Sequence, residues 1–198
     1  GLGAGDIVQN CFSYHMTPAG MIFENGARAV GATVFPAGIG QTELQVQAAH
    51  DLGVTAYAGT PDYLKTILEA ADAADTPLRI TKAAVSGGAL FPALRQMYGD
   101  RGIACLQCYA TADLGNIAYE SPAMEGMIVD EGVIVEIVRP GTGDPVPEGE
   151  VGEVVVTTLN ADYPLIRFAT GDLSAVLPGE RPSGRANMRI TSWRRRAA

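Results

Sequence analysis

The chain has 198 residues, of which 47% are hydrophobic, and it carries a formal net charge of −8. This length and apolar content allow one large domain or two small ones with a substantial core. The net acidity argues against a nucleic-acid-binding surface, because neutralising phosphates requires clustered Lys and Arg. The apolar runs are too short to span a bilayer.

The N-terminal half alternates short apolar runs with amphipathic segments. The predicted strands cover residues 7–8, 32–35, 54–57, 82–85 and 103–106, and the predicted helices cover residues 18–30, 42–52, 62–74 and 92–98. Thr42 and Asp62 are candidate N-caps, and Gln45 completes a capping-box pattern with Thr42. This alternation predicts an α/β fold with a mostly parallel sheet and helices on both faces, within a subdomain of residues 1–122.

The pattern changes after Ser121. Residues 126–138 alternate in polarity and are rich in β-branched side chains, residues 139–145 supply turn chemistry, and residues 149–159 give a further strand signal. We therefore expect a smaller β-rich, barrel-like subdomain over residues 123–180, and an open sheet is the alternative.

The charge is unevenly distributed along the chain. Residues 1–180 hold all 22 acidic residues and eight of the 14 basic ones, whereas residues 181–198 hold six arginines. Because this basic tail has little apolar content, we expect it to be poorly ordered. A solvated end is the simplest interpretation of the tail, and binding of a polyanion is the alternative.

The first six residues have neither the basic lead nor the apolar core of a signal peptide. The cysteines at positions 11, 105 and 108 are odd in number and lack the spacing of a disulfide framework. Cys105 and Cys108 have a C-x-x-C separation, but neither a second Cys pair nor a His pair completes a zinc site. We therefore expect a cytoplasmic, reduced protein that has no structural zinc and does not associate with membranes.

Three predicted loops carry residues that suit ligand binding. Residues 86–90 contain paired glycines, which let a backbone approach a ligand ahead of a helix, although a tight turn is the alternative. Residues 109–113 offer an aromatic ring for a base and a carboxylate for magnesium; a buried Tyr with an N-capping Asp is the alternative. In residues 167–172, the carboxylate of Asp172 suits the two hydroxyls of a ribose, and a surface pair with Arg167 is the alternative.

The order and spacing of these loops resemble the adenylate-forming superfamily, and in particular its phenylacetate–CoA ligase branch. The similar segments are residues 6–10, 59–61, 86–90, 109–113, 135–137, 141–143, 149–153 and 167–172. The resemblance implies that ATP activates an aryl carboxylate as an acyl-adenylate, and that the thiol of CoA then displaces AMP.

The resemblance also implies roles for individual residues. Those that would bind ATP or AMP are Gly87, Gly88, Ala89, Tyr109, Ala110, Thr111 and Asp172. Among them, Tyr109 would stack on adenine, and Asp172 would accept hydrogen bonds from the ribose hydroxyls. Those that would border the acyl pocket are Phe12, Tyr14, Tyr57 and Pro61. Asp113 stands where the family usually has Glu and would hold magnesium, while the catalytic residue stays unassigned.

Two parts of the family's machinery would lie outside the chain, namely the triphosphate-binding loop before Gly1 and the lysine-bearing domain after Ala198. We therefore expect binding of AMP or acyl-adenylate but little or no ligase activity from the isolated chain. The alternatives are a non-catalytic nucleotide-binding remnant, half of a split enzyme with a complementing chain, and a structural domain without a ligand. Apolar surface exposed by missing portions predicts self-association into a homo-oligomer.

Overall fold

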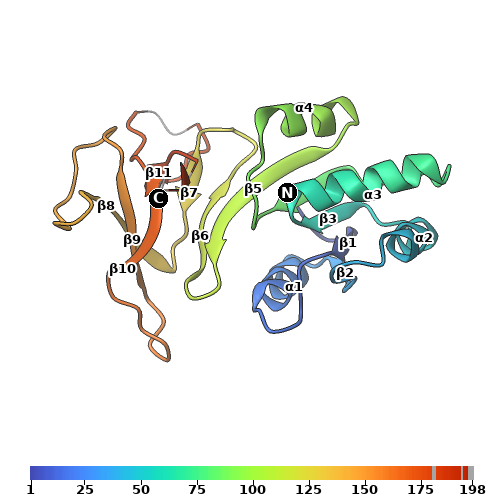
Figure 1. The fold of residues 1–198 in the computed structure, drawn as a ribbon, viewed down its shortest axis with the longest axis horizontal. Coiled ribbons are helices and arrows are strands. Elements are labelled where there is room, and N and C mark those ends of the chain that lie inside the picture. The colour runs from blue at the N-terminus through green and yellow to red at the C-terminus, as the bar shows by residue number, and fades with distance from the viewer. Residues whose placement is uncertain (180–181, 193, 196–198) are drawn as a thin grey trace. The chain divides into compact units, whose positions relative to one another are not determined.

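A computed structural model describes residues 1–179, 182–192 and 194–195 of the chain. Its contacts divide the chain into two compact units, residues 1–107 and residues 108–198 (Figure 1). The division falls within β5 (Ala104–Thr111), before the boundary predicted at residue 122. The reason is that the second half of β5 and the strands after it contribute to a core of their own.

The first unit is a parallel α/β unit. Its strands are β1 (Ile7–Asn10), β2 (Thr33–Phe35), β3 (Ala56–Gly59), β4 (Lys82–Val85) and the first half of β5. They lie in the order β5-β4-β3-β1-β2, and each of these pairings is parallel. The connecting helices are α1 (Ala19–Ala29), α2 (Thr42–Leu52), α3 (Pro61–Ala73) and α4 (Pro92–Asp100). The alternation of strands and helices predicted from the sequence is thus confirmed.

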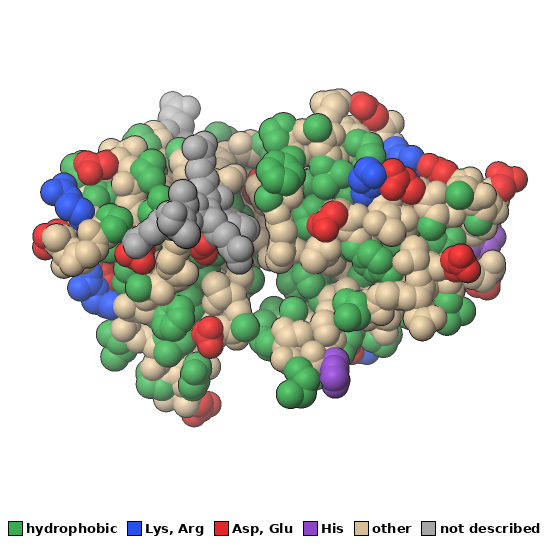
Figure 2. Space-filling view, in the orientation of Figure 1, with side chains coloured by type: hydrophobic (Ala, Val, Ile, Leu, Met, Phe, Trp, Pro, Cys, Tyr) green, Lys and Arg blue, Asp and Glu red, His purple; other side chains and the backbone are tan. Residues whose placement is uncertain are grey.

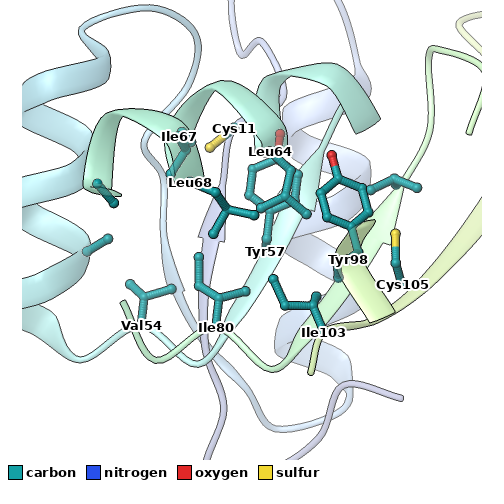
Figure 3. Packing of buried hydrophobic residues seen from close by; sticks show 14 of the residues in the cluster. Cys11, Val54, Tyr57, Leu64, Ile67, Leu68, Ile80, Tyr98, Ile103 and Cys105 are labelled. Atoms are coloured by element: carbon teal, nitrogen blue, oxygen red, sulfur yellow. The ribbon is translucent and has the colours of Figure 1, made fainter. Parts of the chain in front are cut away.

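Helices cover both faces of this sheet, as predicted. Successive residues of a strand point to opposite faces, and β3 separates two clusters in this way. Tyr57 joins residues of α2, α3 and α4 in the larger cluster, which Figure 3 shows in close-up. Ala56 and Ala58 join the smaller cluster, to which α1 contributes Ala27.

The predicted capping box at the start of α2 is wrong. Gln41 is the N-cap, its backbone is left-handed with φ of 52°, and no side chain caps the helix. Gln45 is buried instead, where its Nε2 donates to the carbonyls of Gly38 and Gly40 and its Oε1 accepts from Gln9 Nε2 at 2.8 Å. The buried amide therefore satisfies two carbonyls of the preceding loop, which a local capping pattern does not reveal.

The start of α3 also differs from the prediction. Its N-cap is Thr60, not Asp62, and no side chain caps the helix. Pro61 occupies the first helical position, where the absence of an N–H removes a donor that would have no partner within the helix.

The second unit is antiparallel. The second half of β5 pairs with β6 (Gly115–Glu120), followed by β7 (Met127–Val129) and β11 (Arg189–Ile190). A second sheet has the order β12-β10-β9-β8, with β8 (Val133–Val138), β9 (Gly152–Thr158), β10 (Phe168–Ser174) and β12 (Arg194–Arg195). Since β8 and β12 are its two edges, this sheet is open among the described residues, which is the open-sheet form of the predicted β-rich subdomain.

Both sheets of the second unit contribute to one core. Ile117 and Met127 pack in the same cluster as Val135, Val154 and Ile190. Ile190 belongs to the predicted tail of residues 181–198, and its side chain is fully buried in this core. The prediction that the tail is poorly ordered is therefore wrong for β11. Residues 180–181, 193 and 196–198 lie outside the described residues.

None of the helices in the described part of the chain combines the length and apolar character that a membrane crossing needs. On the face shown in Figure 2, the described Lys and Arg side chains lie beside acidic ones and do not gather into one basic patch.

Candidate functional site

Two of the predicted nucleotide-binding residues meet inside the second unit. The hydroxyl of Tyr109 donates a hydrogen bond of 2.8 Å to Oδ2 of Asp172. Tyr109 lies on β5 and Asp172 on β10, so the contact joins one strand from each of the unit's two sheets. Asp172 is half-buried.

A strand irregularity positions Asp172. The pairing of β10 with β9 shifts register between Ala169 and Leu173, and Gly171 has φ of 76°. The Asp172 N–H donates to Oγ1 of Thr170 at 3.2 Å, and that hydroxyl donates to the Val154 carbonyl at 2.9 Å. The segment predicted as a loop is therefore a bulged strand, a device that re-aims a side chain at the edge of a ladder.

Tyr109 is a buried tyrosine, the alternative interpretation of the sequence. Only 3% of the residue is exposed, and its ring packs in the core of the second unit. Burial raises the pKa of the Tyr109 phenol well above its ordinary value, and the neighbouring Asp172 carboxylate raises it further. The hydroxyl therefore remains a donor at neutral pH, while the ring presents little surface on which a base could stack.

Arg167 does not pair with Asp172, so that alternative is wrong. Its Nε lies 3.0 Å from Oε2 of Glu136, and its Nη2 donates to the Gly143 carbonyl at 2.8 Å. These contacts connect the start of β10 with β8 and with the turn that follows β8. Because Arg167 is exposed, its ion pair contributes little to stability.

The other predicted residues of this segment lie at the end of β5 and in the turn after it. Ala110 and Thr111 are half-buried, and the Thr111 hydroxyl accepts the Leu114 N–H at 3.1 Å. Asp113 is exposed in the turn before β6, so it caps no helix. Within the described residues, no group of three or more His, Cys, Asp or Glu side chains could hold a metal ion. Asp113 thus offers one carboxylate, which fits a magnesium ion that also binds substrate phosphates and water.

In the first unit, the glycine loop lies at the carboxyl end of β4, directly before α4. Gly87 has φ of 72°, and a Cβ on it would lie 3.9 Å from Cε1 of Phe12. A Cβ on Gly88 would lie 3.4 Å from Cδ of Pro61. The structure therefore brings the predicted nucleotide-binding loop next to two residues predicted to border the acyl pocket. Ala89 follows directly and is exposed.

Phe12 and Tyr14 lie beside α1. The ring of Phe12 is stacked on that of Phe23, with centroids 4.1 Å apart. The Tyr14 hydroxyl donates to Glu24 at 2.8 Å and accepts from Asn10 at 2.7 Å. Burial raises the pKa of Tyr14 to about 12, with the Glu24 carboxylate contributing to the increase.

Tyr57 is a core residue and not a pocket wall. It is fully buried, and its hydroxyl donates to the Thr60 carbonyl at 3.0 Å. It belongs to the cluster on the face of α2 and α3, whereas Phe12 belongs to the cluster on the face of α1. The alternation of side chains along β3 separates these two predicted neighbours.

A cavity of about 510 Å³ in the first unit lies away from all of these residues. Its lining includes Asp72, Ile80, Arg101 and Ile103, which lie around the amino ends of β4 and β5. Ligands of open α/β sheets bind at the carboxyl ends of the strands. The cavity therefore lies away from the sheet edge at which nucleotide binding is predicted, and no sequence signal had pointed to it.

Solved structures define the class of fold. A 2-hydroxyisobutyryl-CoA ligase, solved with 2-HIB-AMP and CoA, matches with a TM-score of 0.87 and 23% identity, over 96% of this chain and 44% of that one. A long-chain-fatty-acid-CoA ligase from Archaeoglobus fulgidus matches with a TM-score of 0.67 and 12% identity, over 96% and 44%. The fold is thus that of the adenylate-forming CoA ligases. The family profile described as AMP-binding enzyme matches residues 3–160, and the chain belongs to that family.

Curated relatives narrow the similarity further. The phenylacetate-coenzyme A ligase of Thermus thermophilus is 28% identical over 199 residues, covering 96% of this chain and 45% of that protein. The ligase of the same name from Pseudomonas putida is 32% identical over 190 residues, covering 88% of this chain and 42% of that protein. The resemblance seen in the sequence is confirmed, and the chain spans less than half the length of these relatives.

Proposed function

We propose that this chain binds AMP and an aryl acyl-adenylate, as the central part of an ATP-dependent aryl-acid–CoA ligase. The observation that carries the proposal is the Asp172 carboxylate, half-buried on a strand bulge and held by Tyr109, in a member of the AMP-binding family. The names of the curated relatives support phenylacetate-like substrates, and the structure solved with 2-HIB-AMP and CoA supports the adenylate and CoA.

In the first step, an oxygen of the substrate carboxylate attacks the α-phosphorus of ATP, which forms the acyl-adenylate and releases pyrophosphate. In the second step, the CoA sulfur attacks the acyl carbon, so that a C–S bond forms and the C–O bond to AMP breaks. In this proposal the ionised Asp172 accepts hydrogen bonds from the ribose hydroxyls, and charge-assisted bonds of this kind are the strong ones. Magnesium, when bound, neutralises charge on the phosphates, and Asp113 is the residue that would hold it.

The first unit, taken by itself, offers residues suited to an acyl group and to an anion. The loop of Gly87, Gly88 and Ala89 precedes α4, whose N-terminal amides favour an anion. Phe12 and Pro61 lie against the same loop and provide apolar surface suited to an aryl ring. We propose that residues 1–198 alone have little ligase activity, because they correspond to less than half of the curated relatives.

Calorimetric titration with a non-hydrolysable phenylacetyl-adenylate analogue tests the proposal. Losing a hydrogen bond to a charged group costs about 1.5–3 kcal/mol, so Asp172→Asn should weaken binding at least tenfold. Asp162→Asn removes the same charge from an exposed position of the same unit and should leave the affinity unchanged. If the folded chain does not bind the analogue, or if both variants bind equally well, the proposal is refuted.

A further inference from the structure

We infer that Tyr109 is a positioning residue for ribose recognition, whose hydroxyl fixes the orientation of the Asp172 carboxylate. This inference rests on the proposed function and replaces the stacking role that the sequence had suggested for the ring.

The tyrosine ring is held by packing. Tyr109 is 3% exposed and lies in a cluster with Leu114, Ile117 and Val154. A ring packed in this way cannot change rotamer without disturbing the core, so the position of its hydroxyl is fixed. That hydroxyl lies 2.8 Å from Oδ2 of Asp172, an ordinary length for an O–H···O hydrogen bond.

Within the described part of the chain, the Tyr109 hydroxyl is the hydrogen-bond partner of the Asp172 carboxylate. The torsion that turns an Asp carboxylate about its last bond is broad and has no sharp staggered minima. The backbone of Asp172 is restrained through the Thr170 hydroxyl, but that contact leaves the carboxylate itself unfixed. The Tyr109 hydrogen bond supplies the missing restraint on the side chain.

The same hydrogen bond leaves acceptor capacity for a ligand. An ionised carboxylate has about four lone-pair sites, and Tyr109 occupies one of those on Oδ2. Two ribose hydroxyls can therefore still bind Asp172. Fixing the acceptor before the ligand arrives reduces the ordering that binding would otherwise require.

Paired titrations with AMP and 2′,3′-dideoxy-AMP separate positioning from stacking. Tyr109→Phe keeps the ring and its volume but removes the hydroxyl, so it should weaken AMP binding about tenfold. The dideoxy nucleotide has no diol to present to Asp172, so Tyr109→Phe should change its affinity by less than about twofold. A change of that size is no larger than the error with which independent mutational effects add. Stacking on adenine would instead depend on the ring and would be equal for both nucleotides.

The control is Tyr63→Phe, which removes another phenol hydroxyl, one that donates to the Gly40 carbonyl at 2.8 Å within the first unit. It should change the affinity for neither nucleotide. In an Asp172→Asn background, Tyr109→Phe should add no further loss of AMP affinity, because the restrained carboxylate is gone. This cycle also provides a second test if Tyr109→Phe lowers stability.

The outcomes are distinguishable. If Tyr109→Phe weakens both nucleotides equally or neither of them, while the unchanged chain binds AMP, the positioning role is overturned and the proposed function stands. If the folded, unchanged chain does not bind AMP, the proposed function fails, and the positioning role fails with it.

Discussion

Two glycines of α1, Gly20 and Gly26, should respond to the same substitution in opposite ways. Gly26 is exposed, and a Cβ placed on it meets no other atom within 4 Å. Glycine inside a helix is less stable than alanine by about 0.5–1 kcal/mol, so Gly26→Ala should stabilise the protein by that amount. Gly20 is buried, and a Cβ there would lie 2.8 Å from the Ser13 carbonyl oxygen and 2.8 Å from Cγ of Tyr14.

The neighbours of Gly20 cannot easily move away. The Ser13 carbonyl accepts the Gly20 N–H at 2.9 Å, and the Gly20 carbonyl accepts from Asn10 Nδ2 at 2.9 Å. Overpacking of this kind costs about 1–3 kcal/mol, which exceeds the gain in helix propensity. We therefore expect Gly20→Ala to lower the free energy of unfolding by about 1–2 kcal/mol, which corresponds to roughly 2–8 °C in Tm for a chain of this size.

Urea unfolding followed by circular dichroism measures both changes. The midpoint should rise for Gly26→Ala and fall for Gly20→Ala, with the slope unchanged, since neither substitution alters the surface exposed on unfolding. Gly20→Ala also displaces Tyr14, so it should weaken binding of the acyl-adenylate analogue, whereas Gly26→Ala should not. A Gly20→Ala variant at least as stable as Gly26→Ala would refute the reasoning.

Two further predictions concern ion pairs. Glu125 and Arg189 form a buried ion pair at 3.4 Å, with side chains 2% and 8% exposed. Arg189→Met should lower the free energy of unfolding by about 3–5 kcal/mol, because it leaves the Glu125 charge buried and unpaired. Replacing both residues with apolar ones should lower it by less. An equal loss in the single and double variants, measured by urea unfolding, would contradict this. Burial raises the pKa of Asp6, but hydrogen bonds from Lys82, the Gly3 amide and Thr55 outweigh it and hold that pKa below its ordinary value. The stability that this lowered pKa provides is present above about pH 4 and is lost as the pH falls through the folded-state pKa. Lys82→Met should therefore lower the urea midpoint at pH 7 more than at pH 3. A decrease of the same size at both pH values would count against this account.

The sequence predicts those elements best whose pattern is local. The bounds of α2 and β4 agree with the prediction at both ends, because an amphipathic period and a short apolar run are complete within each segment. The extent of β5 was not predictable in this way. Its second half, from Cys108 to Thr111, is a strand because it pairs with β6, and a single-strand pattern carries no information about its partner.

The same distinction applies to the candidate site. Short motifs indicate the candidate residues of the site, but they carry no information about the contacts of those residues. Tyr109 and Asp172 are 63 positions apart in the sequence, and their hydrogen bond depends on how two sheets pack. Arg167 shows the converse, since its neighbour in sequence, Asp172, is not its partner, and Glu136, which lies 31 positions away, is.

Burial of Tyr109 has two consequences that act together on Asp172. Packing fixes the ring, which sets where the hydroxyl lies, and the same low-polarity surroundings keep the phenol protonated, which ensures that it donates. Phenylalanine at this position would preserve the packing of the ring and lose the hydroxyl donor. The substitution therefore separates the effect of ring packing on stability from the effect of the hydroxyl on the orientation of the carboxylate. Because the Tyr109–Asp172 and Asp172–Thr170 hydrogen bonds lie within the second unit, this effect depends on how that unit folds.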